Sequence, residues 1–188
     1  MLSRLKNQSF KKLMIMLWNI LRMSWLRAKY LKHFQCSIIQ NINPSTEISI
    51  DKGNLQLSHS VFTRRNVSFR VSGGDMKIGT CFFNQGCSVT CLKNITIGDN
   101  CLFGPNVVIV DHDHDYRYST TERGSEYICK DIIIGNNVVV GANTVILKGS
   151  IIGDNCMIGA GSIVTGNVPE GMLYYTNHDK VIKSIFFK

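Results

Sequence analysis

The chain has 188 residues, of which 44% are hydrophobic, so it is long enough for one folded domain and too apolar for global disorder. Its net charge of +8 comes from the N-terminal quarter, because residues 1–46 carry eight lysines or arginines and no acid, whereas the remainder is neutral. A neutral body argues against nucleic-acid binding, so the basic N-terminal segment needs its own explanation.

The seven cysteines form an odd set without a CxxC pair, which favours free thiols in a reducing cytoplasm over a disulfide framework. We expect no cleavable signal peptide, because the apolar run at 13–18 is short and lacks a small-residue cleavage site. We also expect no transmembrane span, because no uninterrupted apolar stretch reaches about 18 residues.

Residues 1–40 are predicted to form a basic amphipathic helical segment. Leu13, Leu17 and Leu21 fall at helical spacing with Ile20, Ser24 and Ala28, and two tryptophans, Trp18 and Trp25, widen the apolar face. One interpretation is a helix that caps the open end of the next domain. The other is an interfacial helix that brings residues 1–32 to an anionic membrane. The pattern leaves both open.

Residues 41–175 are predicted to form the main domain, in which a six-residue period becomes clear towards the C-terminus. From Ile134 an aliphatic residue recurs at every sixth position, and a small or modest side chain follows each one four residues later. The aliphatic positions are Ile134, Val140, Ile146, Ile152, Ile158 and Val164; the second set is Val138, Thr144, Ser150, Cys156, Ser162 and Val168. Neither the 3.6-residue period of a helix nor the two-residue period of a strand produces this pattern.

A six-residue period indicates a prism with three flat faces, in which each hexapeptide supplies one short parallel strand and one corner. We therefore predict an all-β left-handed parallel β-helix, with Gly and Asn at corners that need left-handed backbone conformations. Each coil of about 18 residues buries its interior only against its neighbours, so the repeat must be sustained. A second run with the same pattern spans Ile97 to Ile109, a looser coil begins at Ile78, and residues 48–71 read as short alternating strands with a weakened repeat.

The six-residue period is interrupted between Ile109 and Ile134. Residues 111–131 are polar and read DHDHDYRYSTTERGSEYICKD. An interruption of this length inside a regular solenoid is typical of an extruded functional loop. Among its histidines, we interpret His112 as a solvated side chain.

Residues from 78 onwards resemble the hexapeptide-repeat O-acetyltransferases, which include maltose, galactoside and nodulation-factor enzymes and those that modify capsular or lipopolysaccharide sugars. The resemblance rests on ITIGDNCLFGPNVVI at 95–109 and on VVVGANTVILKGSIIGDNCMIGAGSIVTGNVP at 138–169. It also rests on a histidine, His114, at a fixed distance after the first motif, and on an asparagine, Asn84, thirty residues before it.

The resemblance implies acetyl transfer from acetyl-coenzyme A to a sugar hydroxyl by a homotrimer with active sites between subunits. It implies His114 as general base and Asn84 as the acceptor-binding residue. Asp111 or Asp113 would fix the imidazole tautomer. A poor hydroxyl nucleophile needs a base with a pKa near 7, which imidazole provides.

The resemblance also assigns coenzyme A binding to residues on two parts of the chain. Ala142 and Ala160 would meet the pantetheine arm, Thr165 and Gly166 the region near the nucleotide, and Lys180 and Lys183 the phosphates, within the predicted C-terminal tail, 176–188.

Three departures from the family pattern stand in the sequence. Gly166 replaces a lysine, residues 176–179 read TNHD where the family has GNPA, and Cys91 and Leu92 occupy positions where sugar acetyltransferases often have an aspartate. These changes favour an acceptor other than a simple sugar. We expect a hydroxyl of a cell-surface polysaccharide or its lipid-linked precursor.

Three other functions remain open at this point. The chain could acetylate a small acceptor such as serine, a free sugar or an antibiotic, or it could be a non-catalytic scaffold. Zinc-dependent hydration, known for some β-helices with three histidine ligands, fits less well because the five histidines include no HxxxxH pair. We expect no metal requirement.

Overall fold

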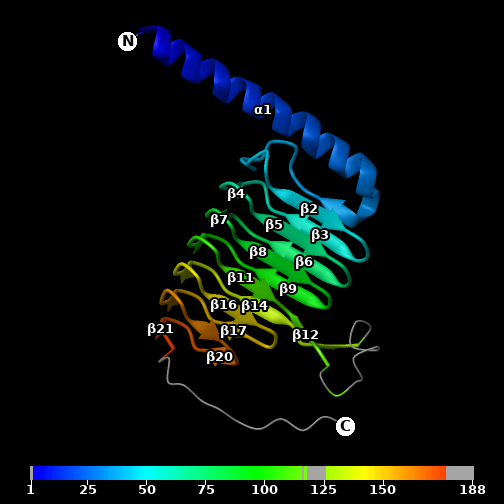
Figure 1. Ribbon diagram of the computed structural model, residues 1–188, viewed down its shortest axis with the longest axis vertical. Helices are drawn as coiled ribbons and strands as arrows, with labels where there is room; N and C mark the ends of the chain where they lie inside the picture. Colours follow the sequence, from blue (N-terminus) through cyan, green and yellow to red (C-terminus); the bar gives the residue numbers. More distant parts are fainter. Residues whose placement is uncertain (1, 116, 118–125, 177–188) are drawn as a thin grey trace.

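Short strands joined by tight corners make up most of the chain, as the six-residue period requires. The computed structural model describes residues 2–115, 117 and 126–176. The strands stack into a left-handed parallel β-helix of about seven turns with one long N-terminal helix across its first turn (Figure 1). The predicted fold class is confirmed.

The prism has three sheets of parallel strands, which the chain visits in a fixed order. Sheet 1 contains β2 (Glu47–Ile50), β5 (Ser68–Val71), β8 (Ser88–Cys91), β11 (Val108–Val110), β16 (Val145–Leu147) and β19 (Ile163–Val164). Sheet 2 contains β1 (Phe34–Gln35), β3 (Asn54–Leu57), β6 (Asp75–Ile78), β9 (Asn94–Ile97), β14 (Ile132–Ile134), β17 (Ile151–Ile152) and β20 (Asn167–Val168). Sheet 3 contains β4 (Phe62–Thr63), β7 (Cys81–Phe83), β10 (Cys101–Phe103), β15 (Val139–Val140), β18 (Met157–Ile158) and β21 (Leu173–Tyr174).

The length of each coil explains why the repeat is clear in one half of the sequence and loose in the other. Val145 pairs with Ile163, 18 positions later, whereas Glu47 pairs with Ser68, 21 positions later. The extra residues lie at the corners, so the early coils keep their strand pairing without keeping a six-residue period. The prism also begins before residue 41, because β1 already pairs with β3.

The interior of the prism is filled as the repeat predicts. All six aliphatic positions from Ile134 to Val164, and all six positions four residues after them, are buried. In the earlier coils aromatic rings fill the same space, and the rings of Phe83 and Phe103 stack with their centroids 4.5 Å apart. Stacking of equivalent side chains from turn to turn therefore gives the solenoid its continuous core.

Asparagine and glycine occupy the corners in the left-handed backbone conformation that we predicted. Six asparagines in the prism have positive φ: Asn66, Asn100, Asn106, Asn137, Asn143 and Asn155. Two pairs of them are hydrogen-bonded between successive turns, Asn106 with Asn143 and Asn137 with Asn155, each over 3.1 Å. Their amides thus support the corners that their backbone conformation makes possible.

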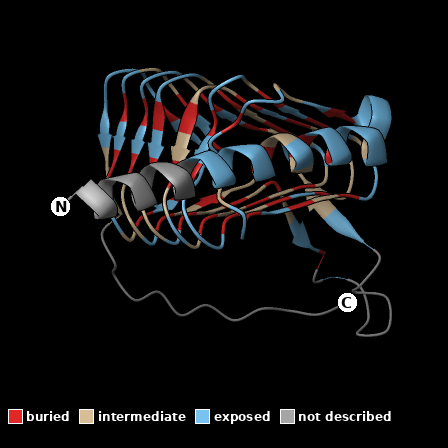
Figure 2. Cartoon of the chain, turned by 90° about the horizontal axis from the view of Figure 1, so that it is seen from above, coloured by how far each residue is buried: buried red, intermediate tan, exposed pale blue. Residues whose placement is uncertain are grey.

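The N-terminal helix α1 (Leu2–Tyr30) crosses the open end of the first coil and leads through a short 3₁₀ turn, Leu31–His33, into β1 (Figures 1 and 2). Met23 and Leu26 are buried, the Arg22 guanidinium donates to the carbonyl groups of Asn43 and Thr46, and the amide of Asn19 donates to Gln40. The helix therefore covers the prism end, but through the Asn19, Met23 and Leu26 side.

The apolar face predicted for this helix points elsewhere. Its large side chains at Leu13–Trp18, Leu21 and Trp25 are exposed. Within the residues that the structure describes, no helix combines the length and apolar character needed to cross a bilayer.

Residues after β11 leave the prism as predicted and form a small antiparallel hairpin. β12 (His112–His114) pairs with β13 (Tyr127–Cys129), and the chain re-enters the prism at β14. The hairpin projects from the corner between sheets 1 and 2 (Figure 1).

Candidate active site

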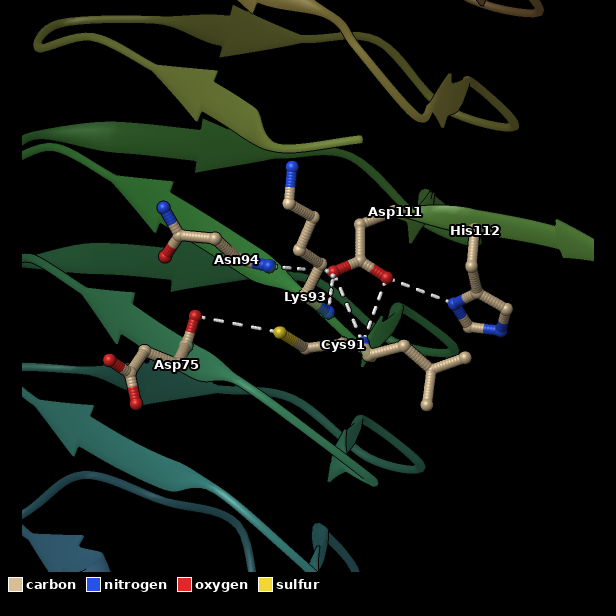
Figure 3. Close-up of polar contacts among 7 residues, drawn as sticks. Asp75, Cys91, Lys93, Asn94, Asp111 and His112 are labelled. Carbon is tan, nitrogen blue, oxygen red and sulfur yellow. Dashed lines mark hydrogen bonds and ion pairs between the residues drawn. The ribbon is translucent and has the colours of Figure 1, made fainter. Parts of the chain in front are cut away.

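The carboxylate of Asp111 is buried at the root of the hairpin and accepts hydrogen bonds from the preceding turn of the prism (Figure 3). The backbone N–H groups of Leu92, Lys93 and Asn94 donate to its two oxygens over 2.7–3.1 Å. A buried carboxylate is stable only when donors surround it, and here three of them belong to rigid backbone. Asp111 therefore fixes the point at which the hairpin leaves the prism.

The imidazole of His112 supplies the fourth donor group to this carboxylate. Its Nδ1 lies 2.9 Å from Oδ1 of Asp111, and only 15% of its side chain is exposed (Figure 3). The interpretation of His112 as a solvated side chain was wrong. Asp111 orients an imidazole as the sequence suggested, but the imidazole that it orients is that of His112.

His114 lies two residues further along β12, on the same face of the strand as His112, because strand side chains alternate. Tyr127, directly opposite His114 in the hairpin, contacts both rings. Its ring centroid lies 4.8 Å from that of His114 and 5.3 Å from that of His112, the latter in an edge-on arrangement. The hairpin thus presents two imidazoles and one phenol on one face.

Asp113, the second candidate for fixing the imidazole tautomer, points to the other face of β12. Its carboxylate forms an ion pair with Lys148, which follows β16 in the prism. A second ion pair, between Lys93 and Asp131, spans 3.0 Å at the same corner. Asp113 therefore braces the hairpin from the side opposite the imidazoles.

The corner between sheets 3 and 1 carries three further predicted site residues: Asn84, Ala142 and Ala160. At this corner the backbones of successive turns approach each other closely, because each turn has a glycine there. A Cβ atom on Gly104 would lie 2.7 Å from the nitrogen of Ala142, and one on Gly141 would lie 2.4 Å from the nitrogen of Ala160. Only glycine permits this approach, and the result is a strip of backbone with few side chains.

Asn84 stands at the edge of this strip, beside a shallow hollow on sheet 3. Its side-chain oxygen accepts from the N–H of Gln85 over 2.8 Å. The hollow has a volume of about 430 Å³, and its floor is mostly apolar, with Phe82, Leu102 and Val139 among its lining residues.

Thr165 and Gly166 follow β19 at the corner between sheets 1 and 2, the corner that also bears the hairpin. Gly166 has a φ of +76°, a conformation that would strain a lysine, which gives the glycine a local reason to replace the family's lysine. Lys180 and Lys183 lie outside the described residues.

The predicted site residues thus fall at two corners of one chain, with the width of sheet 1 between them. His114, Asp111, Thr165 and Gly166 are at one corner, and Asn84, Ala142 and Ala160 at the other. The sequence reasoning missed His112 and Tyr127. An aspartate directly before a histidine, with a second histidine two residues on, was the available signal for His112, whereas no pattern in the sequence indicates the pairing of Tyr127.

Two of the buried cysteines, Cys87 and Cys91, are unsuited to act as nucleophiles. Burial, followed by the nearby charge of Asp111, raises the pKa of the Cys91 thiol, and burial also raises the pKa of Cys87. The raised pKa keeps these groups in the unreactive thiol form at neutral pH. In the described part of the chain, no three His, Cys, Asp or Glu side chains group closely enough to hold a metal ion.

Two segments match models of transferase repeats. Residues 131–166 match the bacterial transferase hexapeptide (six repeats), and residues 94–110 match the hexapeptide repeat of succinyl-transferase. These matches confirm the resemblance to hexapeptide-repeat transferases, over the coils that flank the hairpin.

Proteins similar to the chain carry acetyltransferase names. It is 38% identical over 114 residues to the galactoside O-acetyltransferase of Escherichia coli K12, covering 60% of this chain and 56% of the relative. It is 30% identical over 119 residues to WbbJ of the same organism, named for O-acetyl transfer in lipopolysaccharide biosynthesis, with 56% and 61% covered. The chain thus spans little more than half the length of these curated relatives.

A solved structure shares the architecture. The polySia-specific acetyltransferase NeuO superimposes with a TM-score of 0.55 at 27% identity, over 80% of this chain and 75% of NeuO. The likeness extends beyond the matched repeats and includes earlier coils of the prism.

Proposed function

We propose that this protein transfers the acetyl group of acetyl-coenzyme A to a hydroxyl group of a glycan, with His114 as the general base. The observation that carries the proposal is the interruption of the prism after β11, which projects His114 from a corner next to the coils that match transferase repeats. Relatives named for O-acetyl transfer to galactosides and in lipopolysaccharide biosynthesis support the same reaction class.

The glycine-rich strip at the corner between sheets 3 and 1 suits the donor. A pantetheine arm is thin and carries two amides, so it needs a shallow surface with accessible backbone groups rather than a deep pocket. The close packing at Gly104 and Gly141 provides such a surface beside Ala142 and Ala160. Thr165 lies at the hairpin corner, so the Thr165 that would contact the nucleotide end comes from a neighbouring subunit. Lys180 and Lys183 would meet the phosphates, which ammonium groups favour.

The reaction needs one proton acceptor and no covalent enzyme intermediate. The acceptor hydroxyl oxygen would attack the thioester carbonyl carbon while a ring nitrogen of His114 takes the hydroxyl proton. Collapse of the tetrahedral intermediate breaks the carbon–sulfur bond, and the imidazolium returns the proton to the departing thiolate. The products are the acetyl ester and coenzyme A. A backbone N–H near the strip would stabilise the oxyanion.

A second copy of the chain would complete the site. Asn84 and His114 of one chain are at different corners, so an acceptor held by Asn84 would meet the base of a neighbouring subunit. Sheet 3 also presents a continuous row of apolar side chains next to Asn84, one from each turn: Phe62, Phe82, Leu102, Val139, Met157 and Leu173. Most of them are well exposed, as expected for an oligomer interface. We propose the homotrimer that the resemblance implies.

The exposed side of α1 would bring this assembly to the cytoplasmic face of a membrane. Trp18, Leu21 and Trp25 are each more than half exposed, and the basic residues of this segment have no acids between them. Tryptophan favours the membrane–water boundary, and lysine and arginine favour anionic lipid headgroups. An acceptor carried on a membrane lipid, as a polysaccharide precursor is, would then be within reach.

Acetyl-coenzyme A turnover with purified cell-envelope glycans tests the proposed reaction. Acceptor-dependent release of coenzyme A, with acetyl esters detected on the glycan, is the expected result. Turnover with serine, a free sugar or an antibiotic, and none with the glycans, would show that the acceptor is a small molecule and not a glycan. No turnover with any acceptor, together with no binding of coenzyme A, would overturn the enzyme proposal in favour of a scaffold.

A further inference from the structure

We propose that His112 is a positioning residue: anchored by Asp111 and packed against Tyr127, it fixes the ring orientation of His114. This inference rests on the proposed function, because it assigns a role to His112 in the reaction for which His114 is the base. The resemblance assigns no role to His112, and three contacts in the hairpin support the role proposed for it.

The first contact anchors His112 to the prism. An ionised carboxylate only accepts hydrogen bonds, so the 2.9 Å contact places the proton of His112 on Nδ1. The same carboxylate is held by backbone N–H groups of the preceding turn, at Leu92, Lys93 and Asn94. The imidazole of His112 is therefore fixed in position and tautomer by a part of the molecule that does not belong to the hairpin.

The second and third contacts, from His112 to Tyr127 and from Tyr127 to His114, connect His114 to the fixed imidazole of His112. The Tyr127 ring lies with its plane at 87° to that of His112, with centroids 5.3 Å apart, and at 40° to that of His114, with centroids 4.8 Å apart. The Tyr127 ring, which has an imidazole on each of two sides, has little freedom to rotate, and the His114 ring packs against it. A continuous line of contacts thus runs from the prism to the base, through Asp111, His112, Tyr127 and His114 in that order.

The hairpin needs such support because two short strands alone are marginally stable in water. General-base catalysis, in contrast, requires the imidazole nitrogen within hydrogen-bond reach of the acceptor hydroxyl. A displacement of about 1 Å can cost about 100-fold in rate. An imidazole on an unbraced hairpin would lose that geometry, and the line of contacts through Tyr127 preserves it.

The test compares three substitutions of His112 in the full-length protein. His112→Ala removes both contacts and should lower kcat about 10- to 100-fold, with the KM for acetyl-coenzyme A within about twofold of wild type. His112→Asn keeps a donor to Asp111 without the ring, and His112→Phe keeps the ring without the donor. Each should retain a kcat between those of wild type and His112→Ala.

Two results in this series would overturn the inference. If all three variants lose as much activity as His114→Ala, then His112 itself takes the proton. If all three stay within about twofold of wild type, the ring of His114 does not depend on His112. His59→Ala, which removes an exposed imidazole from an early coil of the prism, is the matched control and should leave kcat unchanged.

A measurement without activity separates failure of this inference from failure of the proposed function. In protein labelled with ¹⁵N,¹³C-histidine, the His114 ring signals are identified by their loss in His114→Ala. They should shift in His112→Ala and in Tyr127→Ala but stay in place in His59→Ala. Unchanged His114 signals in His112→Ala would overturn the positioning role, whether or not the wild type turns over acetyl-coenzyme A.

Discussion

The backbone N–H of Lys93 donates to Oδ2 of Asp111 over 2.7 Å, which joins two successive turns of the prism at the point where the hairpin departs. This bond has equivalents on either side, at Leu92 and Asn94, so a single buried carboxylate holds a whole corner. Asp111 therefore determines where the hairpin that carries His112 and His114 leaves the prism.

Replacing Asp111 should destabilise the fold as well as the site. In Asp111→Asn the amide group faces backbone N–H donors, and a buried donor or acceptor without a partner costs about 1–3 kcal/mol. We expect the free energy of unfolding in urea to fall by about 2–3 kcal/mol. Glu47→Gln, which breaks an exposed ion pair with Arg70, is the control and should cost less than about 1 kcal/mol. Equal losses in both variants would contradict the structural role of Asp111.

The thiols should be unreactive in the folded protein. Burial raises the pKa of Cys36 to about 11 and also raises the pKa of Cys91 and Cys129, so little thiolate exists at pH 7.5. Five of the seven cysteines are buried, so Ellman's reagent should label those five slowly in the native state and all seven quickly in denaturant. Rapid labelling of several thiols in native protein would contradict the packing described here.

The same shifts predict how stability depends on pH. The folded-state pKa of these thiols lies above the value of about 8.5 that they have when unfolded, so the unfolded chain loses its thiol protons first. Their contribution to stability is therefore present below about pH 8.5 and is lost as pH rises towards the folded-state pKa. In a urea series from pH 7 to 10, Cys91→Ala should show a smaller decline than wild type.

How far the sequence predicts this molecule differs between the prism and the hairpin. The six-residue period specifies which side chains point inward, so the buried positions from Ile134 to Val168 follow from the pattern alone. The N-terminal coils keep the same pairing with longer corners, and corner length leaves no periodic signal. The sequence therefore predicts the β-helix fold for the whole prism. It predicts the buried positions residue by residue only in the C-terminal half.

The site was less predictable because its contacts depend on where an irregular segment folds. The resemblance selected His114 and Asn84 but could not show that Asp111 is held by Lys93 and pairs with His112. That pairing depends on the exit angle of the hairpin, which no repeat encodes. The packing side of α1 was also misjudged, because its apolar residues surround much of the helix and the polar Asn19 faces inward.

Subunit mixing tests whether the site is shared between chains. His114→Ala and Asn84→Ala should each be inactive alone, since each lacks one half of every site. If the two halves come from different subunits, co-refolded mixtures should regain up to about a quarter of wild-type turnover, the fraction of interfaces with both residues intact. Mixtures that stay inactive, although mass measurement shows mixed trimers, would place both residues of each site in one chain.

Vesicle binding tests the proposed role of the exposed side of α1. Wild-type protein should sediment with vesicles that contain anionic phosphatidylglycerol and remain in solution with neutral phosphatidylcholine. Replacing Trp18, Leu21 and Trp25 by serine should abolish sedimentation and leave turnover of a soluble glycan unchanged. As a control, serine at Ile133 and Ile151, which are exposed on sheet 2, should not alter binding. Retention of vesicle binding without the tryptophans would contradict the proposal.

The most direct test of the central claim is the acetyl-transfer rate of His114→Ala beside that of His59→Ala, an exposed histidine on an early coil of the prism. If His114 is the base, its replacement should lower acceptor-dependent turnover about 10²–10⁴-fold without lowering the thermal midpoint, while His59→Ala keeps wild-type turnover. Wild-type turnover in a folded His114→Ala protein would show that another group takes the proton and would contradict the account.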